Sequence, residues 1–221
     1  MTELPSLVLT ELRESPRRPG RYLLTLSDGR LLVVGIAALA DTGTTRAGLE
    51  LTPEQVAALV QESTITELAD RALDALARGR RTRRELELRL CKREAAPADI
   101  RAALDRLVAA GLLSDETVAQ AEAASRLRRG EAPTRVRQQL RRKGVAGDTV
   151  REAVAEAMSN DGYDELAACR AVAEKRARSL ATSDLTTAER RLLGFLLRRG
   201  YGGSIARRVV RDVLRDGGAD A

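Results

Sequence analysis

The chain has 221 residues, of which 32% are charged and 43% hydrophobic, and its 38 basic and 32 acidic side chains give a net charge of +6. This composition predicts a globular protein and excludes a disordered tail. The longest apolar run, residues 31–40, is about half as long as a membrane span and no N-terminal signal precedes it, so we expect a cytoplasmic protein.

Most kinds of catalytic site are excluded by the residue types present. The chain has no histidine, which removes Ser-His-Asp and Cys-His catalysis and the commonest zinc ligand. The two cysteines, Cys91 and Cys169, lie far apart and outside any CxxC motif, so we expect buried thiols rather than a disulfide or metal site. Neither GxGxxG nor GxxxxGK[ST] occurs. We therefore expect no cofactor and no enzymatic activity.

The first sixty-odd residues of the chain read mainly as β-strands. Residues 6–12, 21–27 and 30–35 are apolar or alternating runs separated by loops rich in proline and glycine. Asp28-Gly29 predicts a two-residue type I′ turn between the second and third runs. The pattern indicates a three-stranded meander.

The pattern of residues 36–64 predicts short helices on either side of a turn with the sequence DTGTTRAG, residues 41–48. One of these helices is expected to begin at Thr52-Pro53, because threonine caps helices and proline favours their first turn. Residues 1–64 hold 6 basic and 8 acidic side chains, whereas residues 65–221 hold 32 and 24. The two parts therefore differ in charge.

From about residue 65 the pattern is helical and repeats three times. Each copy has an apolar i, i+4 pair, a turn and a second apolar pair, and a further amphipathic helix lies upstream at 65–78, 115–129 or 163–180. The pairs are Leu86/Leu90 and Ile100/Leu104, Val136/Leu140 and Val150/Val154, and Leu192/Leu196 and Ile205/Val209. Each unit is thus three helices.

The predicted fold is mainly α. Three tandem three-helix repeats form an elongated curved solenoid, because single units of this kind cannot cover their own apolar faces. A small β-rich domain precedes them. The expected divisions are 1–64 for the β-rich domain, 65–113, 114–160 and 161–221 for the repeats, with the last including the C-terminal tail.

The middle helix of each repeat is strongly basic. Residues 78–93 hold eight Arg or Lys and two Glu, 126–143 hold eight and one, and 190–211 hold seven and no acid. With Val136 and Leu140 on the core face, Arg137 and Arg141 fall at about 100° and 140° on the helical wheel, facing outward.

A solvated helix surface is one interpretation of these arginines, and 35 of the 38 basic residues are Arg, a bias that genome composition can also produce. Surface helices normally intersperse acids, however, so we favour a binding surface repeated along the solenoid. The candidate partner-binding or DNA-binding residues are Arg81, Arg84, Arg89, Lys92, Arg126, Arg128, Arg129, Arg135, Arg137, Arg141, Arg142, Lys143, Arg198 and Arg199.

Such a surface calls for an acidic partner, either nucleic acid or protein. Aromatic residues are 2% of the chain, which argues against recognition of single strands by base stacking but leaves contact with phosphates open. Leu88 lies opposite the core pair of its helix. It is either an exposed protein contact or a second buried neighbour, and we favour the buried one.

At these residues the sequence resembles the RecX family of bacterial regulators. The most similar stretch is residues 111–145, with Gly111, Leu113 and Asp115 before a helix, then Arg126, Gly130, Pro133, Val136, Leu140, Lys143 and Gly144. The segments "TRRELELRL" at 82–90 and "FLLRRGY" at 195–201 also fit. The sequence departs from the pattern at Leu112, Val118 and Glu122, where aromatic residues are usual, and at Glu131-Ala132, where an aromatic-glycine pair is usual.

The resemblance implies a regulator of the RecA recombinase, in DNA repair, homologous recombination and the SOS response. Such a protein would bind the RecA–DNA filament and would inhibit filament growth, ATP hydrolysis and strand exchange. Whether it also contacts single- or double-stranded DNA through the phosphates is left open by the sequence. We expect a monomer with no membrane partner. The alternative is a basic repeat protein that binds nucleic acid directly, without RecA.

Overall fold

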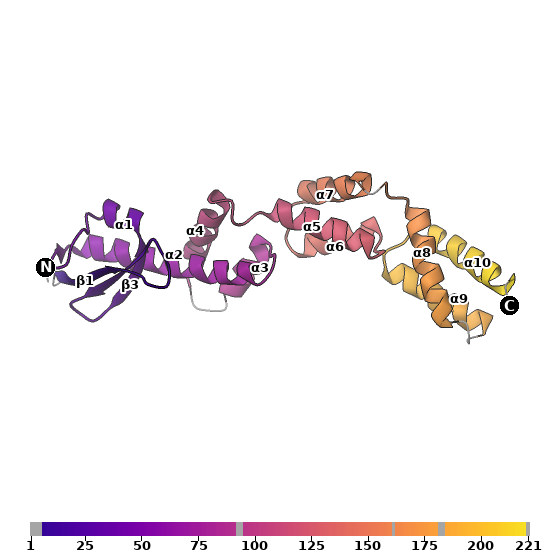
Figure 1. The fold of residues 1–221 in the computed structure, drawn as a ribbon, viewed down its shortest axis with the longest axis horizontal. Helices are drawn as coiled ribbons and strands as arrows, with labels where there is room; N and C mark the ends of the chain where they lie inside the picture. Colours follow the sequence, from indigo (N-terminus) through magenta and orange to yellow (C-terminus); the bar gives the residue numbers. More distant parts are fainter. Residues whose placement is uncertain (1–5, 92–94, 161, 181–183, 220–221) are drawn as a thin grey trace. The chain divides into compact units, whose positions relative to one another are not determined.

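The chain divides into two compact units, Met1–Leu113 and Ser114–Ala221, each of which we describe by itself (Figure 1). The computed structural model describes residues 6–91, 95–160, 162–180 and 184–219. The predicted fold class is confirmed in its main features: the chain is mainly helical, with three-helix repeats that follow a small antiparallel sheet.

The first unit begins with a four-stranded antiparallel sheet of order β3-β2-β1-β4. Its strands are β1 (Leu7–Glu14), β2 (Arg21–Leu26), β3 (Leu31–Gly35) and β4 (Glu50–Leu51). The predicted three-stranded meander is therefore confirmed. The short β4 was not predicted, because two residues carry no recognisable alternation.

The turn between β2 and β3 differs from the prediction. The Gly29 N–H donates to the Leu26 carbonyl at 2.9 Å, and the Leu26 N–H donates to the Arg30 carbonyl at 2.9 Å. This pattern closes a three-residue loop, with Gly29 at φ 86°, so the predicted two-residue type I′ turn is wrong. The Asp28 carboxylate stabilises the loop by accepting from the Arg30 N–H at 3.1 Å.

Helix α1 (Ile36–Asp41) follows the sheet, and α2 (Pro53–Ala77) is a single helix of 25 residues. The prediction of separate helices on either side of residue 64 is wrong, since buried residues continue along α2 without a break. Thr52 caps α2 as predicted: its side chain accepts from the Gln55 N–H at 3.3 Å, and the Gln55 side chain accepts from the Thr52 N–H at 2.8 Å.

Helix α2 supplies two hydrophobic cores. Its first half packs Val56 and Leu59 against the sheet, and its second half packs Leu68 and Ala72 against α3 (Arg83–Leu90) and α4 (Pro97–Ala109). Arg106 of α4 also donates to both carboxylate oxygens of Glu62 on α2, each at 2.6 Å. One helix thereby belongs both to the β-rich part and to the first three-helix repeat (Figure 1).

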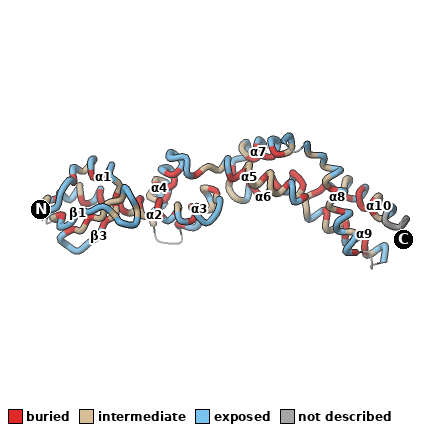
Figure 2. Tube along the Cα trace, in the orientation of Figure 1, coloured by how far each residue is buried: buried red, intermediate tan, exposed pale blue. Residues whose placement is uncertain are grey.

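The second unit holds the other two repeats. The second repeat consists of α5 (Asp115–Arg128), α6 (Pro133–Arg142) and α7 (Gly147–Asn160). The third repeat consists of α8 (Glu165–Ala177), the short 3₁₀ helix η1 (Arg178–Leu180), α9 (Leu185–Arg198) and α10 (Gly203–Ala219). Buried residues line the inner sides of the helices in each repeat (Figure 2).

The apolar pairs predicted to form the repeat cores are buried, with one exception. Ile205 is only partly buried, whereas its neighbour Ala206 is fully buried together with Val209 and Val210. Residues at i, i+3, i+4 of α10 therefore face the core, and Ile205 lies at the edge of that face.

Two further predictions of burial are wrong. Leu88 is 60% exposed, because it lies on the side of α3 opposite Leu86 and Leu90, which are the residues of this helix that pack into the core. Cys91 is also exposed, since it caps the C-terminus of α3 outside the core. Cys169 is buried as predicted, and burial raises the pKa of its thiol to about 11, so this thiol stays protonated at neutral pH.

Candidate binding surface

The outward face of α6 gathers three of the predicted arginines. Val136 and Leu140 are fully buried on the inner side of the helix, which turns the remaining positions outward. A shallow hollow of about 480 Å³ lies on that outer side, lined by Thr134, Arg137, Gln138, Arg141 and Arg142. Within the described part of the chain, no carboxylate forms an ion pair with any of these three guanidinium groups. We call Arg137, Arg141 and Arg142 the α6 arginine face.

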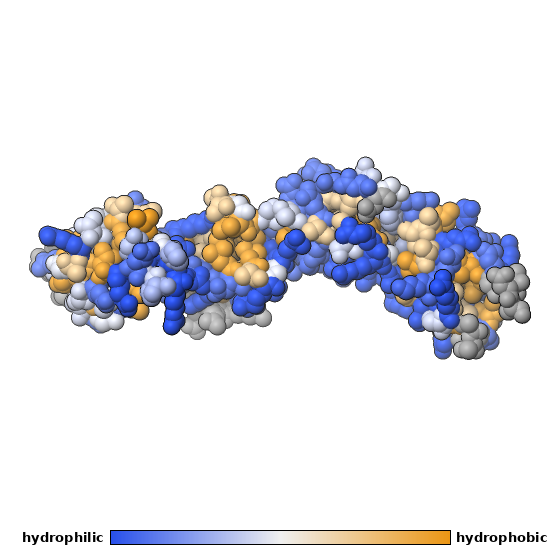
Figure 3. All heavy atoms as spheres, viewed as in Figure 1, coloured by the Kyte–Doolittle hydropathy of each residue, from blue (hydrophilic) through white to orange (hydrophobic). Residues whose placement is uncertain are grey.

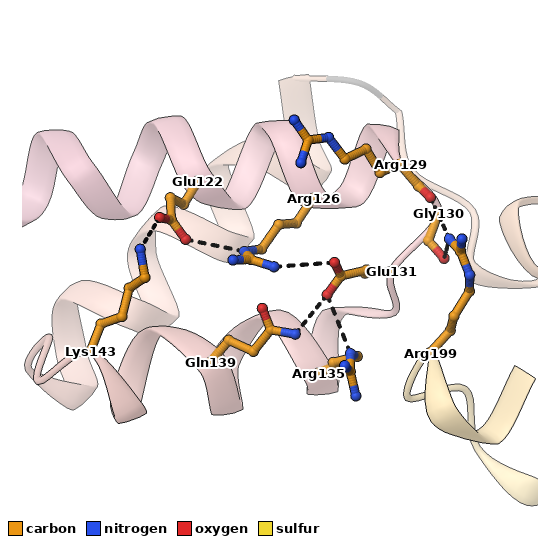
Figure 4. A network of polar contacts seen from close by, with 9 residues as sticks. All are labelled: Glu122, Arg126, Arg129, Gly130, Glu131, Arg135, Gln139, Lys143 and Arg199. Carbon is orange, nitrogen blue, oxygen red and sulfur yellow. Dashed lines mark hydrogen bonds and ion pairs between the residues drawn. The ribbon is translucent and has the colours of Figure 1, made fainter. Parts of the chain in front are cut away.

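Other basic residues of the same repeat are held by carboxylates inside it (Figure 4). Glu122 on α5 pairs with Lys143 at the end of α6, and it accepts from the Nε of Arg126 at 3.1 Å. Arg126 in turn donates through Nη1 to Glu131 at 3.2 Å. Lys143 and Arg126 therefore link α5 to α6 and to the loop between them.

Glu131 extends this network to the start of α6. It accepts from the side-chain amide of Gln139 at 2.9 Å and lies 3.4 Å from the Nε of Arg135. Burial raises the pKa of Glu122, but hydrogen bonds and charge from Lys143 and Arg126 outweigh it and hold this pKa below the ordinary value. Glu122 is therefore ionised at neutral pH.

Arg199 joins the second repeat to the third. Its Nη1 donates to the carbonyl oxygens of Arg129 at 2.5 Å and Gly130 at 3.2 Å, which lie at the end of α5 (Figure 4). The Tyr201 hydroxyl donates to the same Gly130 carbonyl at 3.2 Å, and the Ala132 N–H donates to the Arg199 carbonyl at 2.9 Å. Arg199 thus satisfies carbonyls at a helix end, as C-terminal cations often do.

The remaining predicted residues are distributed over both units. Arg81 is half-buried, and its Nε lacks a hydrogen-bond partner among the described residues. Lys92 lies outside the described residues. The exposed members are Arg84 and Arg89 on α3, Arg128 and Arg129 at the end of α5, and Arg198 at the end of α9.

The ion pairs that Glu122 and Glu131 form with these basic residues were missed by the sequence reasoning. The charge count over residues 126–143 stopped short of Glu122, which lies on the preceding helix. Its i, i+4 spacing to Arg126, and that of Glu131 to Arg135, was the signal that could have found them. Glu122 and Glu131 are also positions at which the sequence departs from the family pattern.

The described residues contain no cluster of His, Cys, Asp and Glu side chains arranged to hold a metal ion. Nor does any described helix combine the length and apolar character needed to cross a bilayer.

Comparison with known proteins identifies the repeats. Residues 114–154 match the family model described as the second three-helix domain of RecX, and residues 163–210 match the third. A solved structure titled as regulatory protein RecX shares the fold, with a TM-score of 0.71 and 20% identity over 93% of this chain and 99% of the other. RecX from Lactobacillus salivarius gives a TM-score of 0.55 and 18% identity over 68% and 96%.

Two curated relatives support the same family by sequence identity. The regulatory protein RecX of Halorhodospira halophila is 38% identical over 60% of this chain and 79% of the relative. That of Amycolatopsis mediterranei is 35% identical over 67% and 83%. With such identity over more than two thirds of each relative, and with both repeats of the second unit matched, this chain belongs to the RecX family of regulatory proteins.

Proposed function

We propose that this chain is a non-enzymatic regulator that binds the RecA filament on DNA and inhibits filament growth, ATP hydrolysis and strand exchange. Membership of a family of regulatory proteins supports the regulatory role. The single observation that supports an acidic partner is the α6 arginine face, where three guanidinium groups lie together without carboxylate partners among the described residues.

The basic residues fall into two roles under this proposal. Arg126, Arg135, Lys143 and Arg199 make contacts within the second unit and serve mainly to hold it together. Arg137, Arg141 and Arg142 are the principal contacts to the filament, with other exposed arginines as secondary ones. Arg84, Arg89, Arg128, Arg129 and Arg198 are those secondary candidates.

The domain divisions 1–64, 65–113, 114–160 and 161–221 belong to the same proposal. The first of them passes through α2, so the β-rich part and the first repeat would move as one body. The protein would act as a monomer in the cytoplasm, where its proposed partner works.

The test is a titration into RecA with single-stranded DNA and ATP. The proposal predicts that ATP turnover falls and that filaments shorten as the chain is added, with both effects complete near the stoichiometry of binding. Unchanged turnover and filament length at an excess of the chain over RecA would contradict it.

Direct binding to nucleic acid is the second candidate function. The hollow on α6 is lined by three arginines, a threonine and a glutamine, side chains that commonly contact phosphates. Binding of this kind weakens steeply with salt, with a slope of about −0.7 per neutralised phosphate on single strands. Tight, salt-dependent binding to naked DNA without any effect on RecA would favour this candidate over the first.

A further inference from the structure

The three repeats allow equivalent outward positions to be compared. The buried pairs Leu86/Leu90, Val136/Leu140 and Leu192/Leu196 are equivalent, so the residues that follow each member of a pair are equivalent too. These residues are Glu87 in α3 and Cys91 at its C-terminal cap, Arg137 and Arg141 in α6, and Leu193 and Leu197 in α9. The outward face is therefore basic in the second repeat but apolar in the third.

The apolar positions of α9 lie at the surface. Leu197 is 47% exposed. Leu193, one turn before it, is partly buried against the core of the third repeat and is only partly accessible. Gly194 lies between them, and an added Cβ there would lie 3.2 Å from the Nη1 of Arg198, so the arginine side chain folds over the glycine. The helix therefore presents Leu197 and part of Leu193 at its surface, next to Gly194, which has no side chain.

Exposed arginines lie beside these leucines, on the side of the helix that faces away from the core. Arg190, Arg191 and Arg198 are exposed on the same helix, and within the described ranges none of them forms an ion pair with a carboxylate. Figure 3 shows apolar and strongly hydrophilic surface side by side over α8 and α9. The charges around the leucines call for a partner that carries carboxylates or phosphates.

The leucines decide which of these partners fits. A phosphate backbone offers no apolar surface against which Leu197 could be buried, and contact with bases relies on aromatic stacking. Phe195 does not serve for stacking, because the guanidinium groups of Arg176 and Arg199 lie over its ring at 5.6 and 4.9 Å. An i, i+4 leucine pair flanked by arginines instead matches an acidic protein surface that has an apolar centre.

We propose that the outward face of α9, formed by Leu193 and Leu197 with Arg190 and Arg198, docks an acidic protein surface. This inference rests on the proposed function, in which that protein is RecA in its filament. It adds a partly apolar protein contact on the third repeat to the contact proposed for the α6 arginine face of the second.

The test replaces Leu197 with serine, a change that removes the apolar side chain without changing the charge. Leu112→Ser is the matched control, because Leu112 is 56% exposed on the other unit. Binding of each variant is measured by co-sedimentation with RecA filaments formed on single-stranded DNA with a non-hydrolysable ATP analogue, and by anisotropy with the same DNA alone. The conservative variant Leu197→Met checks that an apolar side chain restores binding.

Leu197→Ser is expected to bind the filament about tenfold more weakly, the loss that follows when a leucine no longer buries its surface in an interface. Its binding to naked DNA should equal that of the wild type, and Leu112→Ser and Leu197→Met should bind the filament normally. Wild-type filament binding by Leu197→Ser, or an equal loss on naked DNA, would overturn the α9 assignment alone. Failure of the wild-type chain to bind the filament would overturn both this inference and the proposed function.

Discussion

Gly200 packs directly against Arg135, a residue of the preceding repeat. A Cβ added to Gly200 would lie 2.5 Å from the Cβ of Arg135 and 3.1 Å from its backbone nitrogen. Gly200 also has φ 91°, in the left-handed region that favours glycine. Contact with backbone atoms cannot be relieved by a rotamer change, so the close approach of the second and third repeats requires glycine here.

Gly200→Ala is therefore expected to destabilise the second unit by about 2–4 kcal/mol, the sum of backbone strain and overpacking. Gly111→Ala is the matched control, because Gly111 has φ 69° but nothing within 4 Å of an added Cβ. That control should lose only about 1 kcal/mol. Urea denaturation followed by circular dichroism measures both, and equal losses would show that the contact with Arg135 carries no cost.

The core pair of α6 gives a second prediction. Leu140 and Val136 have no exposed surface, so Leu140→Ala should cost about 2–5 kcal/mol and Val136→Ala an amount toward the lower end of that range. Leu88→Ala should change stability by less than about 0.5 kcal/mol, since this leucine is 60% exposed. Thermal and urea denaturation of the three variants provide the comparison. A large loss from Leu88→Ala would mean that its side chain packs in solution.

The repeat cores could be predicted from the sequence because each apolar pair has helical spacing and recurs in three copies. The length of α2 could not, because its division at residue 64 was drawn from a change in composition, whereas Ile65 and Leu68 simply continue the buried face. The exposure of single side chains on the surface was harder still to predict. Whether Leu88 is buried or exposed depends on which elements pack against α3, and local periodicity does not encode that.

The candidate site was predictable only in part. The outward direction of Arg137 and Arg141 follows from the wheel and agrees with the hollow that they line. The pairing of Lys143 with Glu122 does not follow from the wheel, because these residues are 21 positions apart and meet only when α5 packs on α6. Tertiary contacts of this kind decide which arginines are left for a partner.

The Glu122 network predicts a dependence of stability on pH. The pKa of Glu122 is lowered in the folded state, so its ionised form adds stability above its unfolded pKa, and this stability is lost as the pH falls through the folded pKa. Glu122→Gln should remove on the order of 1 kcal/mol at pH 7 and should flatten the decline in stability below about pH 5.

Glu152→Gln serves as the control for that experiment. Glu152 is exposed on α7, and no ion pair to it is found among the described residues. Its variant should keep the wild-type stability at pH 7 and the wild-type decline in acid. If Glu122→Gln also follows the wild-type curve, the contacts with Lys143 and Arg126 do not stabilise the fold.

Charge reversal on the α6 arginine face separates binding from folding. Arg137, Arg141 and Arg142 changed together to Glu should leave helicity and melting temperature nearly unchanged, because outward charges without carboxylate partners contribute little to stability. The matched control reverses Arg207, Arg211 and Arg215, three exposed arginines of α10, and so alters the net charge equally. Circular dichroism and thermal melting check both folds, and unfolding of the α6 variant alone would make its arginines structural.

Co-sedimentation of these two charge-reversal variants with RecA filaments, compared with naked DNA at two salt concentrations, tests the central claim most directly. The account predicts that reversal at Arg137, Arg141 and Arg142 weakens filament binding at least about tenfold, which is about 1.4 kcal/mol, while the α10 control binds like the wild type. Equal binding by both variants, or an equal loss in both, would contradict the claim that the α6 arginine face contacts the filament.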